Sequence, residues 1–330
     1  MKVVSYFRLH ELRWTIADSD IDALRARFPG VTFTSVEEDA ALTAELADAD
    51  VFLGWNFPPK LFAAASRLRW VHSASAGIEA NLFPALVESD VILTNSAGLH
   101  SVCIPEHVLG LMLLLARNFH EAQRLQREQV WDRARVIMFA GGVKELAGSH
   151  LAVIGAGAIG TSVARLGNSL NMLVRVMRRR SSRPVPGAER VVGPDHLHEL
   201  LGWGDFVVLA TPLTAETRHL IDRTALQAMK SSAYLINIAR GEVIDDEALI
   251  DALRSQAIAG AGLDVFSEEP LSSTSPYWSL PNVIVTPHVS GYTPGYFAKM
   301  LALFADNLER LVRGTALRNV VNKRLGYVEQ

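Results

Sequence analysis

The chain lacks the features that mark secreted, nucleic-acid-binding and membrane-spanning proteins. Its 330 residues include one cysteine, Cys103, so no internal disulfide can form. The formal net charge of -3 provides no basic field that would attract a nucleic acid. The longest strongly apolar run, residues 108–116, is shorter than the roughly 20 residues that cross a bilayer. No His or Cys cluster has the spacing of a metal site, so we expect no metal.

The first residues also argue against secretion. Residues 3–7 are typical of a strand and lack the charged and then apolar plan of a signal peptide. We therefore expect a cytoplasmic protein that has neither a nucleic acid nor a membrane as partner.

The order of apolar segments predicts an α/β protein. Nearly half of the residues are apolar, and the length exceeds that of a usual single domain. Strand-like runs alternate with amphipathic helical stretches in two successive series, which favours parallel sheets covered by helices. The strand-like runs are residues 3–7, 31–34, 51–53 and 91–94, and then 151–154, 173–177, 206–210, 233–238 and 259–265. We predict two Rossmann-like, doubly wound parallel-sheet domains with a cleft between them.

Two helical stretches suggest how these domains share the chain. We expect a helix over residues 104–117 to cross from one domain to the other, and a helix over 294–312 to return to the first. The predicted substrate (catalytic) domain is therefore discontinuous, residues 1–98 plus 292–330. Residues 99–291 form the predicted dinucleotide-binding domain.

A glycine-rich turn carries the strongest chemical signal. An apolar run over 151–154 leads into Gly155, Gly157 and Gly160, and a helical pattern follows. Gly155 permits the tight turn, Gly157 lets backbone approach a pyrophosphate, and Gly160 lets the helix pack on the strand. The helix start at Ala158 and Ile159 directs unpaired N–H groups at the phosphates. This pattern predicts a dinucleotide site; the alternative is a purely structural turn.

The residues after the second strand indicate which dinucleotide binds. Proteins that bind NAD carry an Asp or Glu there, which accepts hydrogen bonds from the adenosine ribose. This chain has Arg178 and Arg179, whose guanidinium groups suit a 2′-phosphate. We therefore predict NADP(H) as the preferred cofactor and keep NAD(H) as the second. The alternative is a solvated basic loop.

Three late segments join a strand to ionisable groups. They are residues 236–241, 262–270 and 283–291, which contain Arg240, Glu269 and His288. In open parallel sheets, ligands bind at the carboxyl ends of the strands. Each segment alone is also consistent with a strand followed by an ordinary polar turn.

The three segments, in this order behind the glycine turn, resemble those of the D-isomer-specific 2-hydroxyacid dehydrogenases. The similarity extends from residues 73–78 to Gly291, and its most specific parts are 237–241, 263–270 and 286–288. The resemblance implies that Arg240 holds the substrate carboxylate and carbonyl, that His288 is the general acid or base, and that Glu269 orients the histidine.

Those implied roles are chemically reasonable. Reduction of a 2-oxo acid develops negative charge on the carbonyl oxygen, so a proton donor and a nearby cation both lower the barrier. A histidine side chain has an unperturbed pKa of about 6.5, and a neighbouring carboxylate favours its protonated form. An arginine side chain stays charged and matches a carboxylate with two donors.

Further positions follow from the resemblance. Ala76 and Gly77 match a loop whose N–H groups hold the substrate carboxylate; the alternative is an ordinary strand-to-helix turn. Trp55 follows the third strand, where we expect it to line the substrate pocket. On the cofactor side the resemblance implies contacts from Thr211, Pro212, Ala239, Asp264 and His288; Asp264 alternatively caps a turn. Trp131 falls in a segment that crosses a homodimer in relatives, and its alternative is a core position.

The chain departs from most relatives at Arg178, where Asp is usual, and at Ser75, where Gly is usual. Among the subfamilies it is most similar to the glyoxylate and hydroxypyruvate reductases that prefer NADP. The expected activity is hydride transfer between NADP(H) and a small 2-oxo acid or D-2-hydroxy acid. The alternatives are a dinucleotide-sensing protein of the corepressor type and a phosphite-type dehydrogenase.

Overall fold

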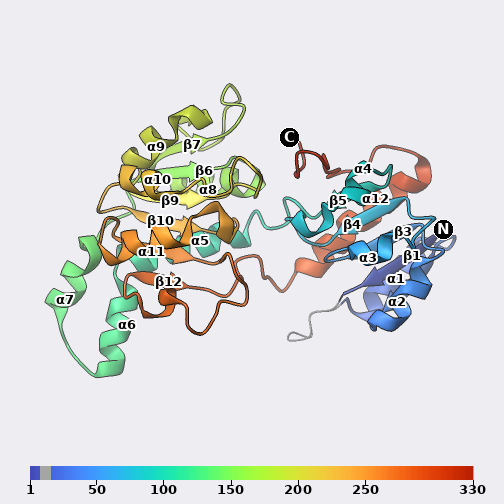
Figure 1. Cartoon of the computed structure of the whole chain (residues 1–330), viewed down its shortest axis with the longest axis horizontal. Helices are drawn as coiled ribbons and strands as arrows, with labels where there is room; N and C mark the ends of the chain where they lie inside the picture. Colours follow the sequence, from blue (N-terminus) through green and yellow to red (C-terminus); the bar gives the residue numbers. More distant parts are fainter. Residues whose placement is uncertain (8–15, 330) are drawn as a thin grey trace. The chain divides into compact units, whose positions relative to one another are not determined.

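The computed structural model describes residues 1–7 and 16–329, which divide into two compact units. The first unit combines residues 1–99 with 293–330, and the second is residues 100–292. Each unit is built on one parallel sheet, so the predicted α/β class is confirmed (Figure 1).

The sheet of the first unit has five strands in the order β2-β1-β3-β4-β5. Its strands are β1 (Lys2–Tyr6), β2 (Thr32–Val36), β3 (Val51–Gly54), β4 (Trp70–Ser73) and β5 (Ile92–Asn95). Its helices are α1 (Asp18–Arg27), α2 (Asp39–Leu46), α3 (Pro59–Phe62), α4 (Pro84–Glu88) and α12 (Tyr296–Arg313), with a 3₁₀ turn at Glu79–Asn81. All neighbouring strands are parallel.

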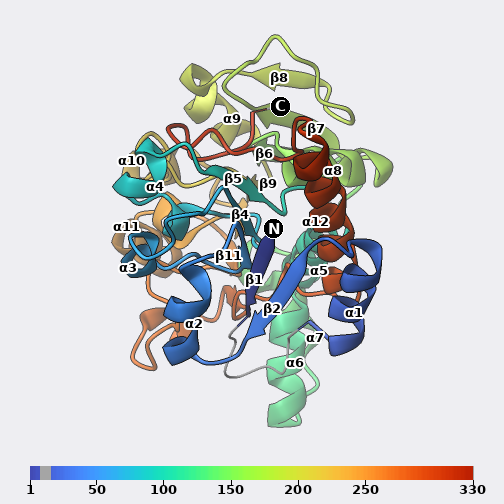
Figure 2. The same cartoon turned by 90° about the vertical axis from the view of Figure 1, so that its right-hand side faces the viewer.

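Helices cover both faces of this first sheet. Figure 2 shows α1 and α12 on one face and α2, α3 and α4 on the other. Trp70 is fully buried and stacks on Phe304 of α12 with ring centroids 4.9 Å apart. α12 belongs to the first unit and completes one of its two apolar cores.

The sheet of the second unit has seven parallel strands in the order β12-β11-β10-β9-β6-β7-β8. They are β6 (His150–Ile154), β7 (Leu173–Met177), β8 (Arg190–Val192), β9 (Phe206–Leu209), β10 (Tyr234–Asn237), β11 (Gly260–Leu263) and β12 (Val283–Val285). The chain moves outward from β6 through β7 to β8 and then returns to β9 on the other side of β6. The carboxyl ends of β6 and β9 therefore flank the switch point where such sheets bind ligands.

Alternation along β6 explains the two layers of helices in the second unit. Leu151 and Val153 pack with α5 and α8, whereas Ala152 and Ile154 pack with α9, α10 and α11. These helices are α5 (Cys103–Ala116), α8 (Ala158–Ser169), α9 (Leu197–Trp203), α10 (Arg223–Ala228) and α11 (Asp246–Arg254). Short 3₁₀ turns lie at Phe139–Gly141, Pro194–His196, Gly241–Val243 and Pro276–Ser279.

One expectation about these elements was wrong, and one strand was not expected. The helix expected to cross between domains is α5, and it lies wholly in the second unit, where it packs on α8, β10 and β11. β8 was not expected from the sequence, because it begins with Arg190 and only three residues pair with β7.

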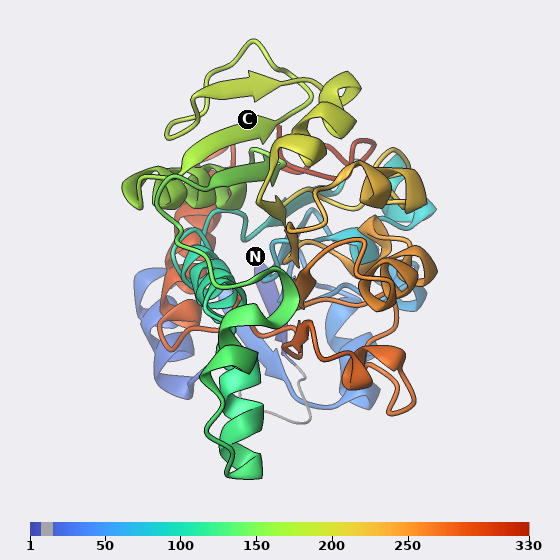
Figure 3. The ribbon, with the colours of Figure 1, turned by 90° about the vertical axis from the view of Figure 1, so that its left-hand side faces the viewer.

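A two-helix extension leaves the second unit after α5. It consists of α6 (Phe119–Glu128) and α7 (Arg133–Met138), and Figure 3 shows α6 projecting away from the rest of that unit. Arg124 and Arg135 both pair with the buried carboxylate of Glu121, at 2.7 and 2.8 Å. This pairing joins the two helices to each other.

Candidate active site

The glycine turn joins β6 to α8 at the switch point of the second sheet. Gly155 has φ +104°, and a Cβ there would lie 2.5 Å from the carbonyl oxygen of Ala210. A Cβ at Gly160 would lie 1.9 Å from the carbonyl oxygen of Gly155, so the helix packs here only with glycine. Gly157 is exposed and has open space on its Cβ side. The fold therefore requires glycine at positions 155 and 160, whereas Gly157 leaves open space that a ligand could occupy.

The start of α8 suits an anion. Its N-cap, Gly157, supplies no side chain, so the first-turn N–H groups of Ala158, Ile159 and Gly160 lack a capping acceptor. A twelve-residue helix also places partial positive charge at this end. These observations fit the pyrophosphate of a dinucleotide.

The loop after β9 lies across the switch point from the glycine turn. Thr211 is half-buried and Pro212 is exposed. The Thr217 hydroxyl donates to the Pro212 carbonyl at 2.7 Å, which closes this loop on itself. Its cofactor contact stays a prediction.

The arginines expected at the adenosine ribose directly follow β7. Arg178 is half-buried, and its N–H donates to the carbonyl of Val192 in β8 at 3.0 Å. Arg179 is exposed and lies 3.9 Å from the carboxylate of Glu216 in the loop after β9. Because both partners are more than half exposed, this ion pair is weak.

Arg240 stands in a tightly folded turn after β10. The Asn237 side chain bridges this turn, since its Nδ2 donates to the Arg240 carbonyl at 2.9 Å and its Oδ1 accepts from the Ala239 N–H at 3.0 Å. A Cβ at Gly241 would lie 1.9 Å from the carbonyl carbon of Phe266. Glycine at 241 thus lets the Arg240 turn press against the segment that leads to Glu269.

Glu269 and His288 form a direct pair. His288 Nδ1 lies 2.7 Å from Glu269 Oε2, and Glu269 Oε1 accepts the Phe266 N–H at 2.9 Å. The second contact fixes the carboxylate, which in turn orients the imidazole. With Nδ1 engaged by Glu269, the other ring nitrogen is Nε2, and the side chain is about half exposed, at 48%.

The charge state of Glu269 follows from its surroundings. Partial burial would raise the pKa of its carboxyl group, but the hydrogen bonds from His288 and from the Phe266 N–H favour the charged form. The positive charges of His288 and Arg240 act in the same direction, so the pKa of Glu269 lies below its usual value. The site therefore holds a carboxylate beside the imidazole.

Asp264 is placed differently from the other predicted contacts. Its side chain is completely buried, and the carboxylate accepts hydrogen bonds from Thr286 Oγ1 and from the N–H groups of Val289 and Ser290, at 2.6, 3.0 and 3.0 Å. These contacts support the alternative role, in which Asp264 holds a turn. That turn contains His288, whose backbone is left-handed at φ +51°.

His107, on α5, belongs to none of the sequence motifs that predicted the site. Its Nε2 lies 3.1 Å from Thr286 Oγ1 and 3.6 Å from Asp264 Oδ1. The available signal was its spacing from Ile104 and Leu111, which places a histidine on the inward face of an apolar helix.

In the first unit, the expected carboxylate loop follows β4. The Asn95 side chain donates to the Ala76 carbonyl at 2.6 Å, and Ser73 Oγ accepts the Ser75 N–H at 3.2 Å. Within the described residues, the N–H groups of Ala76 and Gly77 donate no hydrogen bond. They are thus suited to an anion.

Trp55 belongs to an aromatic cluster in the same unit. Its ring lies 5.7 Å from that of Phe7, 5.9 Å from Tyr296 and 6.0 Å from Phe297, measured between centroids. The Tyr296 hydroxyl donates to the Ala74 carbonyl, and Ser73 Oγ donates to the Trp55 carbonyl at 2.9 Å. The cluster is therefore tied to the loop that contains Ala76 and Gly77.

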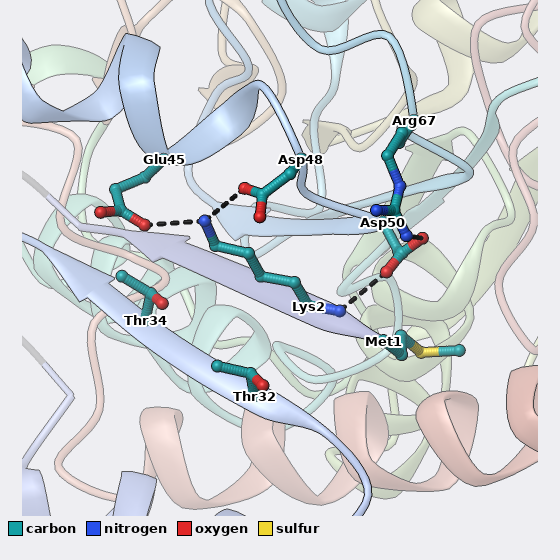
Figure 4. Close-up of a pocket in the computed structure, with 8 residues that line it drawn as sticks. All are labelled: Met1, Lys2, Thr32, Thr34, Glu45, Asp48, Asp50 and Arg67. Carbon is teal, nitrogen blue, oxygen red and sulfur yellow. Dashed lines mark hydrogen bonds and ion pairs between the residues drawn. The ribbon is translucent and has the colours of Figure 1, made fainter.

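A charged hollow lies at the opposite, amino end of the first sheet (Figure 4). There Lys2 Nζ pairs with Glu45 at 2.8 Å and with Asp48 at 2.5 Å, and Asp50 accepts the Lys2 N–H. Arg67 lies 3.4 Å from Asp50. Because these charges compensate one another, the hollow offers little to a ligand.

Within residues 1–7 and 16–329, no group of three or more His, Cys, Asp or Glu side chains could hold a metal ion. No helix in the same ranges is long and apolar enough to cross a membrane.

Comparison with known proteins agrees with this geometry. The family model described as "D-isomer specific 2-hydroxyacid dehydrogenase, NAD binding domain" matches residues 109–290. The chain is 34% identical over 324 residues to a glyoxylate reductase of Thermococcus gammatolerans, with 96% of each chain covered. It is 36% identical over 294 residues to a glyoxylate reductase of Pyrococcus furiosus, which covers 86% of this chain and 85% of that one.

A solved structure shares the whole architecture. The NADPH-dependent glyoxylate/hydroxypyruvate reductase of Sinorhizobium meliloti, in complex with NADP and sulfate, superposes with a TM-score of 0.84 at 26% identity. The match covers 99% of both chains. With its glycine turn and its Glu269–His288 pair, the chain belongs to the D-isomer specific 2-hydroxyacid dehydrogenase family and is an NAD(P)-dependent 2-hydroxyacid dehydrogenase.

Proposed function

We propose that the protein uses NADPH to reduce a small 2-oxo acid, glyoxylate or hydroxypyruvate, to the corresponding 2-hydroxy acid, which has the D configuration where the product is chiral. Support for NADPH comes from Arg178 and Arg179, which stand where a carboxylate would repel the 2′-phosphate. Support for the substrate comes from the relatives named glyoxylate reductase and from the solved glyoxylate/hydroxypyruvate reductase.

The Glu269–His288 pair is the observation that carries the proposal. Glu269 holds the imidazole by Nδ1, so Nε2 gives its proton to the substrate oxygen as that oxygen becomes negative. Bound nicotinamide supplies the hydride for the carbonyl carbon. Proton and hydride together convert the carbonyl into an alcohol, and His288 then takes a new proton from solvent.

The remaining residues are assigned to binding. Arg240 grips the substrate carboxylate, which the N–H groups of Ala76 and Gly77 also suit, and Trp55 limits the size of the substituent. On the cofactor side we assign the pyrophosphate to Gly155, Gly157, Ala158, Ile159 and Gly160 and the 2′-phosphate to Arg178 and Arg179, with neighbouring contacts from Thr211, Pro212, Ala239 and His288. We assign the substrate domain to the first unit and the dinucleotide-binding domain to the second unit.

We also propose that α6 and α7 are covered by a second copy of the chain. Apolar side chains on this extension are exposed, including Phe119 at 49%, Trp131 at 90% and Met138 at 76%, so a core position for Trp131 is wrong. Exposure of several large apolar side chains on one short extension is typical of protein interfaces. Light scattering after size exclusion should give a dimer, and Trp131→Glu should weaken it. A monomer at every concentration would contradict the assignment.

The activity is tested by following NADPH and NADH separately against glyoxylate, hydroxypyruvate and longer 2-oxo acids. We expect NADPH oxidation with the short acids, and His288→Gln should lower turnover by about 10² to 10⁴ while NADPH still binds. Flat traces with every acid, together with cofactor binding, would favour the corepressor-type alternative. Turnover near that of the wild type in His288→Gln would mean that another group supplies the proton.

A further inference from the structure

The packing of α5 on β11 places His107 beside the catalytic loop. Atoms of the Leu111 side chain lie 3.2–3.4 Å from the position that a Cβ would take at Gly262, so glycine there admits a close approach. His107 lies four residues before Leu111, about 6 Å along the helix axis, and Asp264 lies two residues after Gly262, about 6.6 Å along the strand. The contact between Leu111 and Gly262 therefore brings His107 close to Asp264.

The hydrogen bonds around His107 fix its proton. The Thr286 hydroxyl donates its one proton to Asp264 Oδ1 at 2.6 Å. Its oxygen can then only accept at the 3.1 Å contact with His107 Nε2. His107 must accordingly carry a proton on Nε2, and this N–H also lies 3.6 Å from Asp264 Oδ1.

Asp264 extends this chain of contacts to the loop that carries His288. Its carboxylate receives the N–H groups of Val289 and Ser290, and its carbonyl accepts the His288 N–H at 2.8 Å. His288 is thus held from both sides in a left-handed conformation, which residues with a Cβ disfavour. Loss of these hydrogen bonds would let the loop change conformation and move the His288 imidazole out of position.

We propose that His107 is a positioning residue for catalysis: through Thr286 and Asp264 it fixes the loop that presents the His288 imidazole. The inference rests on the proposed function, in which His288 is the proton donor. Packing alone does not explain the residue, because a leucine would also fill the inward face of α5 but would leave Thr286 without its donor.

The test compares His107→Leu with His107→Gln, whose amide nitrogen restores a donor. We expect His107→Leu to lower kcat roughly three- to tenfold, the range of a single lost hydrogen bond, with the KM for NADPH little changed. His107→Gln should stay within about twofold of the wild type. The matched control is His198→Leu on the exposed face of α9, which should leave kinetics unchanged.

A double-mutant comparison distinguishes a positioning role of His107 from a general loss of stability. Thr286→Val removes the same link, so the double variant His107→Leu/Thr286→Val should lose no more kcat than Thr286→Val alone. Additive losses would overturn the proposal, as would wild-type kcat in His107→Leu or an equal loss in His107→Gln.

A readout that does not depend on turnover comes from ¹⁵N-histidine NMR of the wild-type protein. His107 should show a protonated Nε2, assigned by comparison with His107→Gln, and the His288 signals should shift in His107→Leu. An unprotonated Nε2, or unchanged His288 signals, would overturn the inference. His288→Gln is measured in the same series, and if that variant keeps its turnover, the proposed function fails while the NMR result still decides the role of His107.

Discussion

Substitution of Gly157 by alanine should separate cofactor binding from folding. Gly157 has φ -74° and ψ -168°, which alanine adopts without strain, and nothing lies within 4 Å of the added Cβ. A glycine-to-alanine change at a compatible position stabilises a protein by about 0.4–1 kcal/mol, because the unfolded chain loses freedom. The melting temperature of the free protein should therefore stay the same or rise by up to about 4 °C.

The same methyl group occupies the space through which a pyrophosphate would approach the backbone. Loss of one charge-assisted hydrogen bond costs about 1.5–3 kcal/mol, so the Kd for NADPH should rise about 10- to 150-fold. Calorimetric melting without cofactor and a fluorescence titration with NADPH measure the two effects. Gly160→Ala is the contrasting variant and should destabilise the free protein, because its Cβ meets the Gly155 carbonyl. Wild-type NADPH affinity in a stable Gly157→Ala protein would refute the assignment of the turn.

Three further outcomes are expected. Arg178→Asp should raise the KM for NADPH about tenfold or more and leave the KM for NADH unchanged. If this variant and the Arg178/Arg179 double variant both keep the wild-type preference for NADPH over NADH, the two arginines do not bind the 2′-phosphate. Arg240→Lys keeps the charge but loses the two-pronged grip, so steady-state kinetics should show a higher KM for the 2-oxo acid and a lower kcat, whereas wild-type values would place the carboxylate elsewhere. Because the pKa of Glu269 lies below its ordinary 4.5, its charged form stabilises the fold above that pH, and the stability advantage over Glu269→Gln should shrink as pH falls from about 6 to 3. An advantage that stays constant in urea unfolding across this range would show that the carboxylate is not stabilised by its partners.

Much of the fold could be predicted because its signals are local. Alternation of apolar runs and helical stretches located the first strand of each sheet, and β7 (Leu173–Met177) has the bounds expected from the sequence. β8 has only three residues and an arginine at its start, so its apolar run is too short to predict a strand from the sequence. The placement of α5 within the second unit depends on which sheet it packs against, and neighbouring residues do not encode this.

The site shows the same division between local and long-range information. The glycine turn and the Glu269 and His288 segments are short motifs, and the contact between those two side chains follows from motifs in adjacent strand ends. His107 could not be found in that way. Its partners Thr286 and Asp264 lie more than 150 positions later in the sequence, and only the helix–strand contact at Leu111 and Gly262 brings them together.

The discontinuity of the first unit has a consequence for folding during synthesis. Met300, Phe304 and Leu308 of α12 fill one of its apolar cores, and they are made only after the whole of residues 100–292. At about 5–20 residues per second, the uncovered face waits roughly 10 to 40 s for these side chains. The second unit is continuous and can fold as soon as it leaves the ribosome, so the part of the chain that is translated later is expected to be the first to reach its native state. During that interval the emerging amino-terminal sheet is the segment with most need of a chaperone.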